Sequence, residues 1–166
     1  MTPASTKRLV QGVIMARIYY CNGLLYGVPA VHLSKLQRLQ NSAARLITHT
    51  PRYFHITLVL LALHWLPVKF RICQKIAVIS FKAIHNPGPA YLSNLINNKR
   101  CSRSSLRSTV GVTLQDPIAK FKCTFWDRSF TAAAPTIWNG LPDHIRKEND
   151  FVKFKRLIKT YYFKEA

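Results

Sequence analysis

The stretch His64–Leu92, HWLPVKFRICQKIAVISFKAIHNPGPAYL, decides the fold because it joins a strong helical pattern to clear start and stop signals. Pro67 stands where the first turn of a helix tolerates proline, and Asn86-Pro87-Gly88 supplies the stop. Apolar residues between these signals recur at spacings of three and four, and the pattern predicts a central helix that is apolar over most of its surface. The face consists of Phe70, Cys73, Ala77, Phe81 and Ile84, widened by Ile72, Ile76, Ile79 and Ala83.

Helical patterns also precede this stretch. From Thr6, a candidate N-cap, one face is formed by Leu9, Val13, Ala16, Tyr20 and Leu24, and a first helix that is buried is expected there. A second helix is predicted over 30–48 and a short apolar helix over 57–63. The second helix and the central helix each carry one basic stripe. The stripes consist of Lys35, Arg38 and Arg45, and of Arg71, Lys75 and Lys82.

After the central helix the pattern predicts a short helix over 89–96, a basic loop from 97, a short strand over 110–114 and an aromatic segment over 120–138. Asn149 or Asp150 caps a last amphipathic helix. The expected fold class is mainly α: a helical bundle with a basic loop, a C-terminal helical segment and at most one short strand or hairpin. The expected domains are a thumb-like bundle at 1–96, the loop at 97–119 and the C-terminal segment at 120–166.

The charge of the chain is extreme. The 166 residues include 25 Lys and Arg against six Asp and Glu, which gives a formal net charge of +19. Such a surface attracts polyanions, above all nucleic acid. The first carboxylate along the chain is Asp116, so most of the chain lacks the clustered acids that two-metal phosphoryl transfer and glycoside hydrolysis require. No catalytic residue is assigned.

The remaining composition excludes other classes. The four cysteines are too far apart for a redox or zinc motif, and the N-terminus carries no secretory pattern, so reduced thiols and an intracellular protein are expected. The six histidines have no ligand spacing, and no metal or cofactor is expected. The longest apolar run, 56–68, is too short to cross a bilayer, which requires about 20 residues. No membrane partner is expected, although the last helix also has the pattern of a surface-lying helix.

Four strings occur in order along the chain: YCNGLLYG at 20–27, KLQRLQNSAARL at 35–46, LHWLPV at 63–68 and AAPTIWNGLP at 133–142. Together they resemble the C-terminal part of the reverse transcriptase of non-LTR (LINE-type) retrotransposons, and they cover nearly all of the chain. The matching region of that family follows the catalytic palm and corresponds to the helical thumb and the segment beyond it. The resemblance therefore implies a fragment that lacks the palm and the endonuclease and is not an enzyme.

In that family the thumb grips the RNA template and the growing DNA by their backbones. The implied partners are RNA or an RNA–DNA hybrid, contacted through phosphates, and the palm of a full-length element. Lys and Arg suit backbone contacts, which need no reading of base edges. The candidate nucleic-acid-binding residues are the two basic stripes and three arginines of the basic loop: Lys35, Arg38, Arg45, Arg71, Lys75, Lys82, Arg100, Arg103 and Arg107.

Each of these signals also has a plainer interpretation. The stripes could be solvated helix faces, and the basic loop could be a flexible linker instead of a segment that orders on RNA. Trp65, Trp126 and Trp138 fit core anchors better than base-stacking platforms. The alternative functions are a protein-interaction module, held by apolar contacts, and a non-functional relic of a decayed element. Salt-dependent binding separates a nucleic-acid binder from an apolar interaction module.

Overall fold

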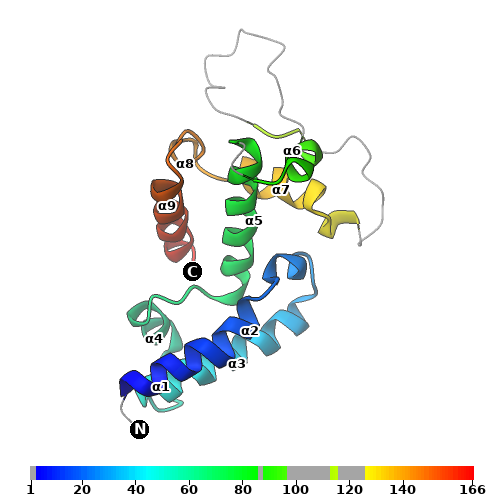
Figure 1. The fold of residues 1–166 in the computed structure, drawn as a ribbon. Helices are drawn as coiled ribbons and strands as arrows, with labels where there is room; N and C mark the ends of the chain where they lie inside the picture. The colour runs from blue at the N-terminus through cyan, green and yellow to red at the C-terminus, as the bar shows by residue number, and fades with distance from the viewer. Residues whose placement is uncertain (1–2, 86–87, 97–112, 116–125) are drawn as a thin grey trace. The chain divides into compact units, whose positions relative to one another are not determined.

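The computed structural model describes residues 3–85, 88–96, 113–115 and 126–166. The protein is mainly α-helical, as predicted, and no strand occurs in these ranges (Figure 1). Of the strand expected over 110–114, only residues 113 and 114 are described, and they are not part of a strand. Most of the basic loop at 97–119 lies outside the described residues.

The chain divides into two compact units, Met1–Ile72 with Tyr162–Ala166, and Cys73–Tyr161. The division falls inside two helices, α5 (Val68–Ile84) and α9 (Phe151–Lys164). The segments expected from the sequence are defined by composition, whereas the compact units are defined by packing. Each unit is described by itself below.

The first unit begins with a continuous helical segment of three parts. Helix α1 (Pro3–Val10) passes through a π-helical turn (Gln11–Met15) into α2 (Ala16–Tyr19). Cys21, at φ 48°, then breaks the helix, and a 3-10 turn (Asn22–Leu25) follows. The buried residues of this segment are Val10, Met15 and Ile18.

The expected inner face of the first helix is therefore wrong. Leu9, Val13, Tyr20 and Leu24 are each more than half exposed, and Ala16 is exposed as well. The inner side is formed instead by Val10, Met15 and Ile18, and the π-helical turn lies between the first two of these residues. Val10 and Met15 are five residues apart, a spacing that the longer π repeat brings toward one side. A pattern of three and four cannot detect this change.

Helix α3 (Ala30–Thr48) has the bounds that the sequence predicts. Its inner face buries Gln40, Ala43, Ala44 and Ile47. Helix α1 packs along α3, and α4 (Ile56–Ala62) packs on α3 as well (Figure 1).

A Schellman motif ends α4. The N–H of Trp65 donates to the carbonyl oxygen of Leu60 at 2.9 Å, and the N–H of His64 donates to that of Leu61 at 2.9 Å. His64 takes the left-handed conformation, at φ 54°, that this motif requires at its centre. Trp65 is 7% exposed, which confirms it as a core anchor. The motif turns the chain toward α5.

Two glutamines of α3 fix the start of α5. Gln37 Oε1 accepts a hydrogen bond from the N–H of Val68 at 2.8 Å, which satisfies a free donor at the helix N-terminus. Gln40 Nε2 donates to the carbonyl oxygen of Leu66 at 2.9 Å and to the hydroxyl of Tyr19 at 3.2 Å. These bonds join segments up to 31 residues apart, so α3 organises the first unit.

Among its described residues, the second unit contains the later part of α5 and five further helical elements. Their bounds are α6 (Ala90–Leu95), the 3-10 turn Trp126–Arg128, α7 (Phe130–Asn139), α8 (Asp143–Arg146) and α9 up to Tyr161. The Phe154 ring stacks on Phe81, with centroids 4.4 Å apart, and lies 5.7 Å from Trp138. All three are fully buried, and they form the aromatic core of this unit.

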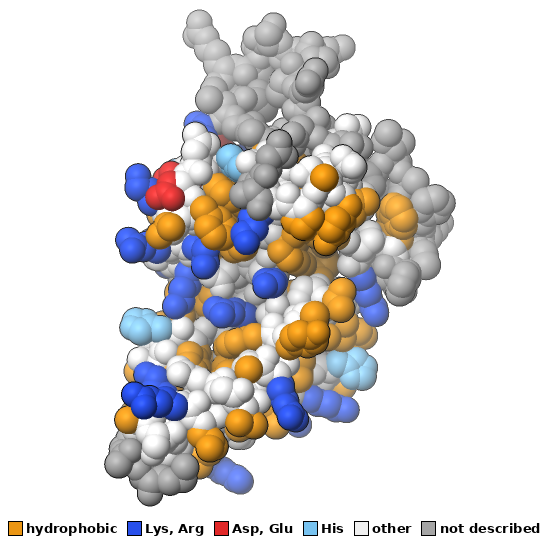
Figure 2. Space-filling view, viewed as in Figure 1, with side chains coloured by type: hydrophobic (Ala, Val, Ile, Leu, Met, Phe, Trp, Pro, Cys, Tyr) orange, Lys and Arg blue, Asp and Glu red, His pale blue; other side chains and the backbone are white. Residues whose placement is uncertain are grey.

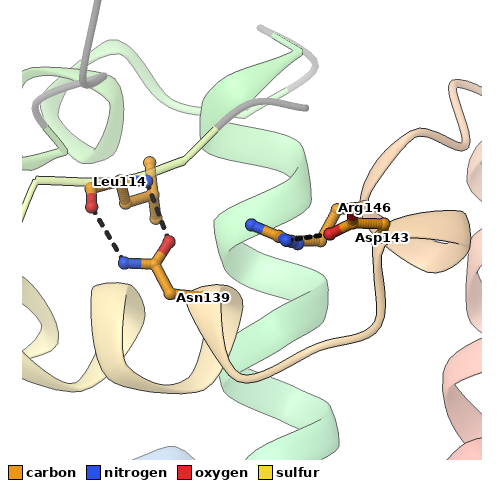
Figure 3. Close-up of polar contacts among 4 residues, drawn as sticks. All are labelled: Leu114, Asn139, Asp143 and Arg146. Atoms are coloured by element: carbon orange, nitrogen blue, oxygen red, sulfur yellow. Dashed lines mark hydrogen bonds and ion pairs between the residues drawn. The ribbon is translucent and has the colours of Figure 1, made fainter. Parts of the chain in front are cut away.

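A side-chain amide holds the short segment 113–115. Asn139 Nδ2 donates to the carbonyl oxygen of Leu114 at 2.9 Å, and the N–H of Leu114 donates to Asn139 Oδ1 at 3.0 Å (Figure 3). The amide thus satisfies both backbone groups of one residue, as a neighbouring strand would. At the start of α9, Asp150 Oδ1 accepts from the N–H of Val152 at 3.0 Å, which confirms the predicted cap.

Candidate nucleic-acid interface

The outer face of α3 carries exposed basic side chains. Lys35 and Arg38 are exposed, and their three-residue spacing places them on one side of the helix, opposite the buried Gln40 and Ile47. Apolar side chains share this outer face, because Leu39 and Leu46 are 55% and 53% exposed. Figure 2 shows Lys and Arg side chains at many places on the drawn face and Asp and Glu at one small patch. The outer face of α3 is thus both basic and partly apolar.

Arg45, the third residue of the α3 stripe, has a structural contact that the sequence did not indicate. Its side chain is half-buried, and Nη2 donates to the carbonyl oxygens of Arg52 and Phe54, each at 3.4 Å. Arg45 therefore braces the loop that follows α3. Its remaining capacity to bind phosphate is smaller than that of the exposed Lys35 and Arg38.

Arg71 belongs to the first unit and is half-buried. Its guanidinium carbon lies 4.5 Å from the centroid of the Tyr19 ring, which is the geometry of a cation–π contact. Burial raises the pKa of the Tyr19 phenol, and the charge of Arg71 and the hydrogen bond from Gln40 oppose that rise. Arg71 is thus partly engaged in the packing of its own unit.

Lys75 and Lys82 belong to the second unit. Lys75 is exposed, whereas Lys82 is half-buried and its Nζ lies 5.1 Å from the centroid of the Phe151 ring. Of the two, Lys75 is more available to a ligand. Arg100, Arg103 and Arg107 lie outside the described residues.

The seven-residue loop His49–His55, HTPRYFH, joins α3 to α4 and contains none of the predicted nucleic-acid-binding residues. Tyr53 is 88% exposed and Phe54 is 48% exposed, and Arg52 and both histidines are exposed too. Basic and aromatic residues side by side were the available signal, because this mixture is typical of single-strand binding surfaces.

Acidic side chains lie mainly in the second unit. Asp143 pairs with Arg146 within α8 (Figure 3), and Asp150 caps α9. In the first unit the carboxylate side chain is that of Glu165, near the end of the chain. Helix α3 itself contains no Asp or Glu, so no acidic side chain of this helix offsets its positive charge.

Other kinds of site have little support in the part of the chain that the structure describes. No group of three or more His, Cys, Asp or Glu side chains there is arranged to hold a metal ion. Within the same ranges, no helix has the length and apolar character needed to span a membrane. In comparisons with known proteins, no family model, no curated protein and no solved structure matches the chain.

Proposed function

We propose that the chain binds nucleic acid through the phosphate backbone, without base specificity and without catalysing a reaction. The observation that carries this proposal is the outer face of α3, where Lys35 and Arg38 are exposed in a chain whose first 115 residues contain no carboxylate. Such a face attracts phosphates and releases their counterions. The likeness of the four ordered strings to the region after the palm of LINE-type reverse transcriptases supports the same role.

The partner that fits this proposal is RNA or an RNA–DNA hybrid. The test measures affinity of the purified chain for both across a series of salt concentrations. The double variant Lys35→Ala/Arg38→Ala is expected to reduce the slope of log affinity against log salt by about 1.4 for single strands, because two phosphate contacts are lost. An affinity that does not change with salt concentration would contradict the proposal.

The chain offers a matched control on α9. Lys153 and Arg156 are exposed at the same three-residue spacing, so Lys153→Ala/Arg156→Ala removes the same charge elsewhere. This control is expected to leave affinity nearly unchanged. An equal loss in both variants would mean that total charge, and not the α3 face, controls binding.

The absence of catalysis has its own test. Primer extension with magnesium and nucleotides is expected to give no product, because the sequence has no pair of adjacent aspartates to hold the metal ions. Synthesis that depends on magnesium would overturn this part of the proposal.

The second candidate function is a protein-interaction module. The observation that favours it is the exposed apolar face made of Leu9, Val13 and Tyr20 on the first helical segment and Leu24 in the 3-10 turn after it. Binding through this face would be insensitive to salt and would be lost on substituting these residues. The same substitutions would leave nucleic-acid binding through α3 intact.

A further inference from the structure

We propose that the His49–His55 loop is a stacking platform for unpaired bases, so that the ligand class of this protein is single-stranded nucleic acid. The inference rests on the proposed backbone binding and adds to it a preference for strands whose bases are free. Its evidence is the display of two consecutive aromatic side chains, Tyr53 and Phe54, beside the exposed Arg52.

The loop is held in one conformation by its neighbours. His49 ends α3 in the left-handed conformation at φ 51°, and the N–H of Phe54 donates to the carbonyl oxygen of Pro51 at 3.2 Å, which closes a turn. Thr48 and Thr50 share a hydroxyl hydrogen bond of 2.7 Å. With the Arg45 bonds to the carbonyls of residues 52 and 54, the backbone is braced on both sides of Tyr53.

This bracing matters for binding. A ligand that stacks on side chains of a fixed turn does not have to order the backbone first, and that ordering cost would otherwise reduce the affinity. An aromatic ring adds a large contact area and has few rotatable bonds. The Tyr53 ring, 88% exposed, has almost its whole surface available to a base.

The positive charge around the loop favours a polyanionic ligand. Arg52 lies in the loop, and Arg38 lies on the same side of α3 as Arg45, seven residues earlier. Seven residues span about 10 Å along a helix axis. A strand on the loop can therefore continue along α3 toward Arg38 within a few nucleotides. No carboxylate of the first 115 residues opposes it.

The aromatic rings favour a single strand over a duplex. In a duplex the faces of the bases are stacked on one another and cannot contact protein rings, whereas unpaired bases are free to stack on aromatic side chains. The basic side chains of α3 alone would bind both single-stranded and duplex nucleic acid. The loop therefore converts a general phosphate contact into a preference for unpaired strands.

The test compares two ligands that differ only in their bases, an oligothymidine and an abasic strand of equal length. The intact chain is expected to bind the oligothymidine about tenfold or more tightly. The variant Tyr53→Ala/Phe54→Ala is expected to bind both equally, at the level of the abasic strand. Both residues are exposed, so helical circular dichroism should be unchanged.

Two further variants sharpen the result. Tyr91 on α6 is 65% exposed, so Tyr91→Ala is a matched control that should keep the full preference for bases. Tyr53→Trp should retain or raise the preference, and the fluorescence of the added indole should fall when oligothymidine binds and not when the abasic strand binds.

The outcomes separate the two proposals. Salt-sensitive binding of both strands with equal affinity would overturn the stacking platform and leave the backbone proposal standing. Binding of neither strand would overturn both. If the chain showed no preference for bases but bound anionic lipid vesicles, and lost that binding in Tyr53→Ala/Phe54→Ala, the loop would be a membrane contact and the stacking proposal would be wrong.

Discussion

Gln40, a fully buried polar residue of α3, donates a hydrogen bond of 2.9 Å to the carbonyl oxygen of Leu66, just before α5 begins. Leu66 is itself fully buried, and a proline follows it. Gln40 therefore supplies this buried carbonyl oxygen with a hydrogen-bond donor. This contact and the Gln37–Val68 bond fix where α5 starts against α3.

Replacing Gln40 should destabilise the fold. Gln40→Met keeps the length of the side chain but leaves the carbonyl of Leu66 buried and unpaired, so we expect the free energy of unfolding to fall by about 1–3 kcal/mol. Denaturant unfolding followed by circular dichroism measures this. The control is Gln11→Met at an exposed position, which should change stability by less than about 0.5 kcal/mol. Equal effects would mean that the Gln40 amide adds nothing to the fold.

Asn139 should control the order of segment 113–115. Asn139→Ala removes both hydrogen bonds to Leu114, so we expect the Leu114 amide to exchange with solvent several-fold faster, which corresponds to about 1 kcal/mol. Hydrogen exchange followed by NMR is the measurement. Asn94→Ala, at an exposed position on α6, should leave the Leu114 amide unaffected. Unchanged protection in Asn139→Ala would show that the leucine side chain alone anchors this segment.

Tyr19 should make stability fall at alkaline pH. Burial raises the pKa of this phenol in the folded chain above the ordinary tyrosine value of 10.0. The unfolded chain therefore loses the proton first as pH rises, so the stabilisation from neutral Tyr19 is complete below the unfolded pKa and is lost as pH rises through the folded pKa.

The variant Tyr19→Phe isolates this effect. It keeps a ring for Arg71 but removes the oxygen that accepts from Gln40, so at about pH 8 we expect it to be less stable by roughly 1 kcal/mol. This difference in unfolding free energy should shrink as the pH rises beyond about 10. Only the chain that retains Tyr19 then loses the stabilisation from the neutral phenol. Unfolding free energies of both proteins across this range are the measurement, and a constant difference would contradict the assignment.

Much of the fold follows from local signals. The bounds of α3 agree with the predicted ones, and the start of α9 and its Asp150 cap agree as well. Caps, prolines and helical periodicity act within a few residues, so a sequence displays them directly. The division into units inside α5 and α9 is not local. It depends on which residues far apart in the chain pack together.

The candidate site likewise has features that follow from the sequence and features that do not. The exposure of Lys35 and Arg38 follows from the face of α3 that the apolar residues leave free. The bracing role of Arg45 does not, because it depends on two carbonyl oxygens that the turn after Pro51 brings within reach. The exposure of Tyr53 and Phe54 depends on that same turn. A pattern of residue types alone cannot separate a displayed aromatic pair from a buried one.

The π-helical turn at Gln11–Met15 leads to the last prediction. The same substitution at two nearby positions, Val10→Thr and Val13→Thr, distinguishes the observed inner face from the one that regular spacing favours. Val10 is fully buried and Val13 is 51% exposed. A buried hydroxyl costs free energy, so we expect Val10→Thr to lower the free energy of unfolding by about 1–3 kcal/mol and Val13→Thr by less than about 0.5 kcal/mol. Denaturant titration of the two variants measures both. Reversed magnitudes would place Val13 in the core and contradict the observed inner face.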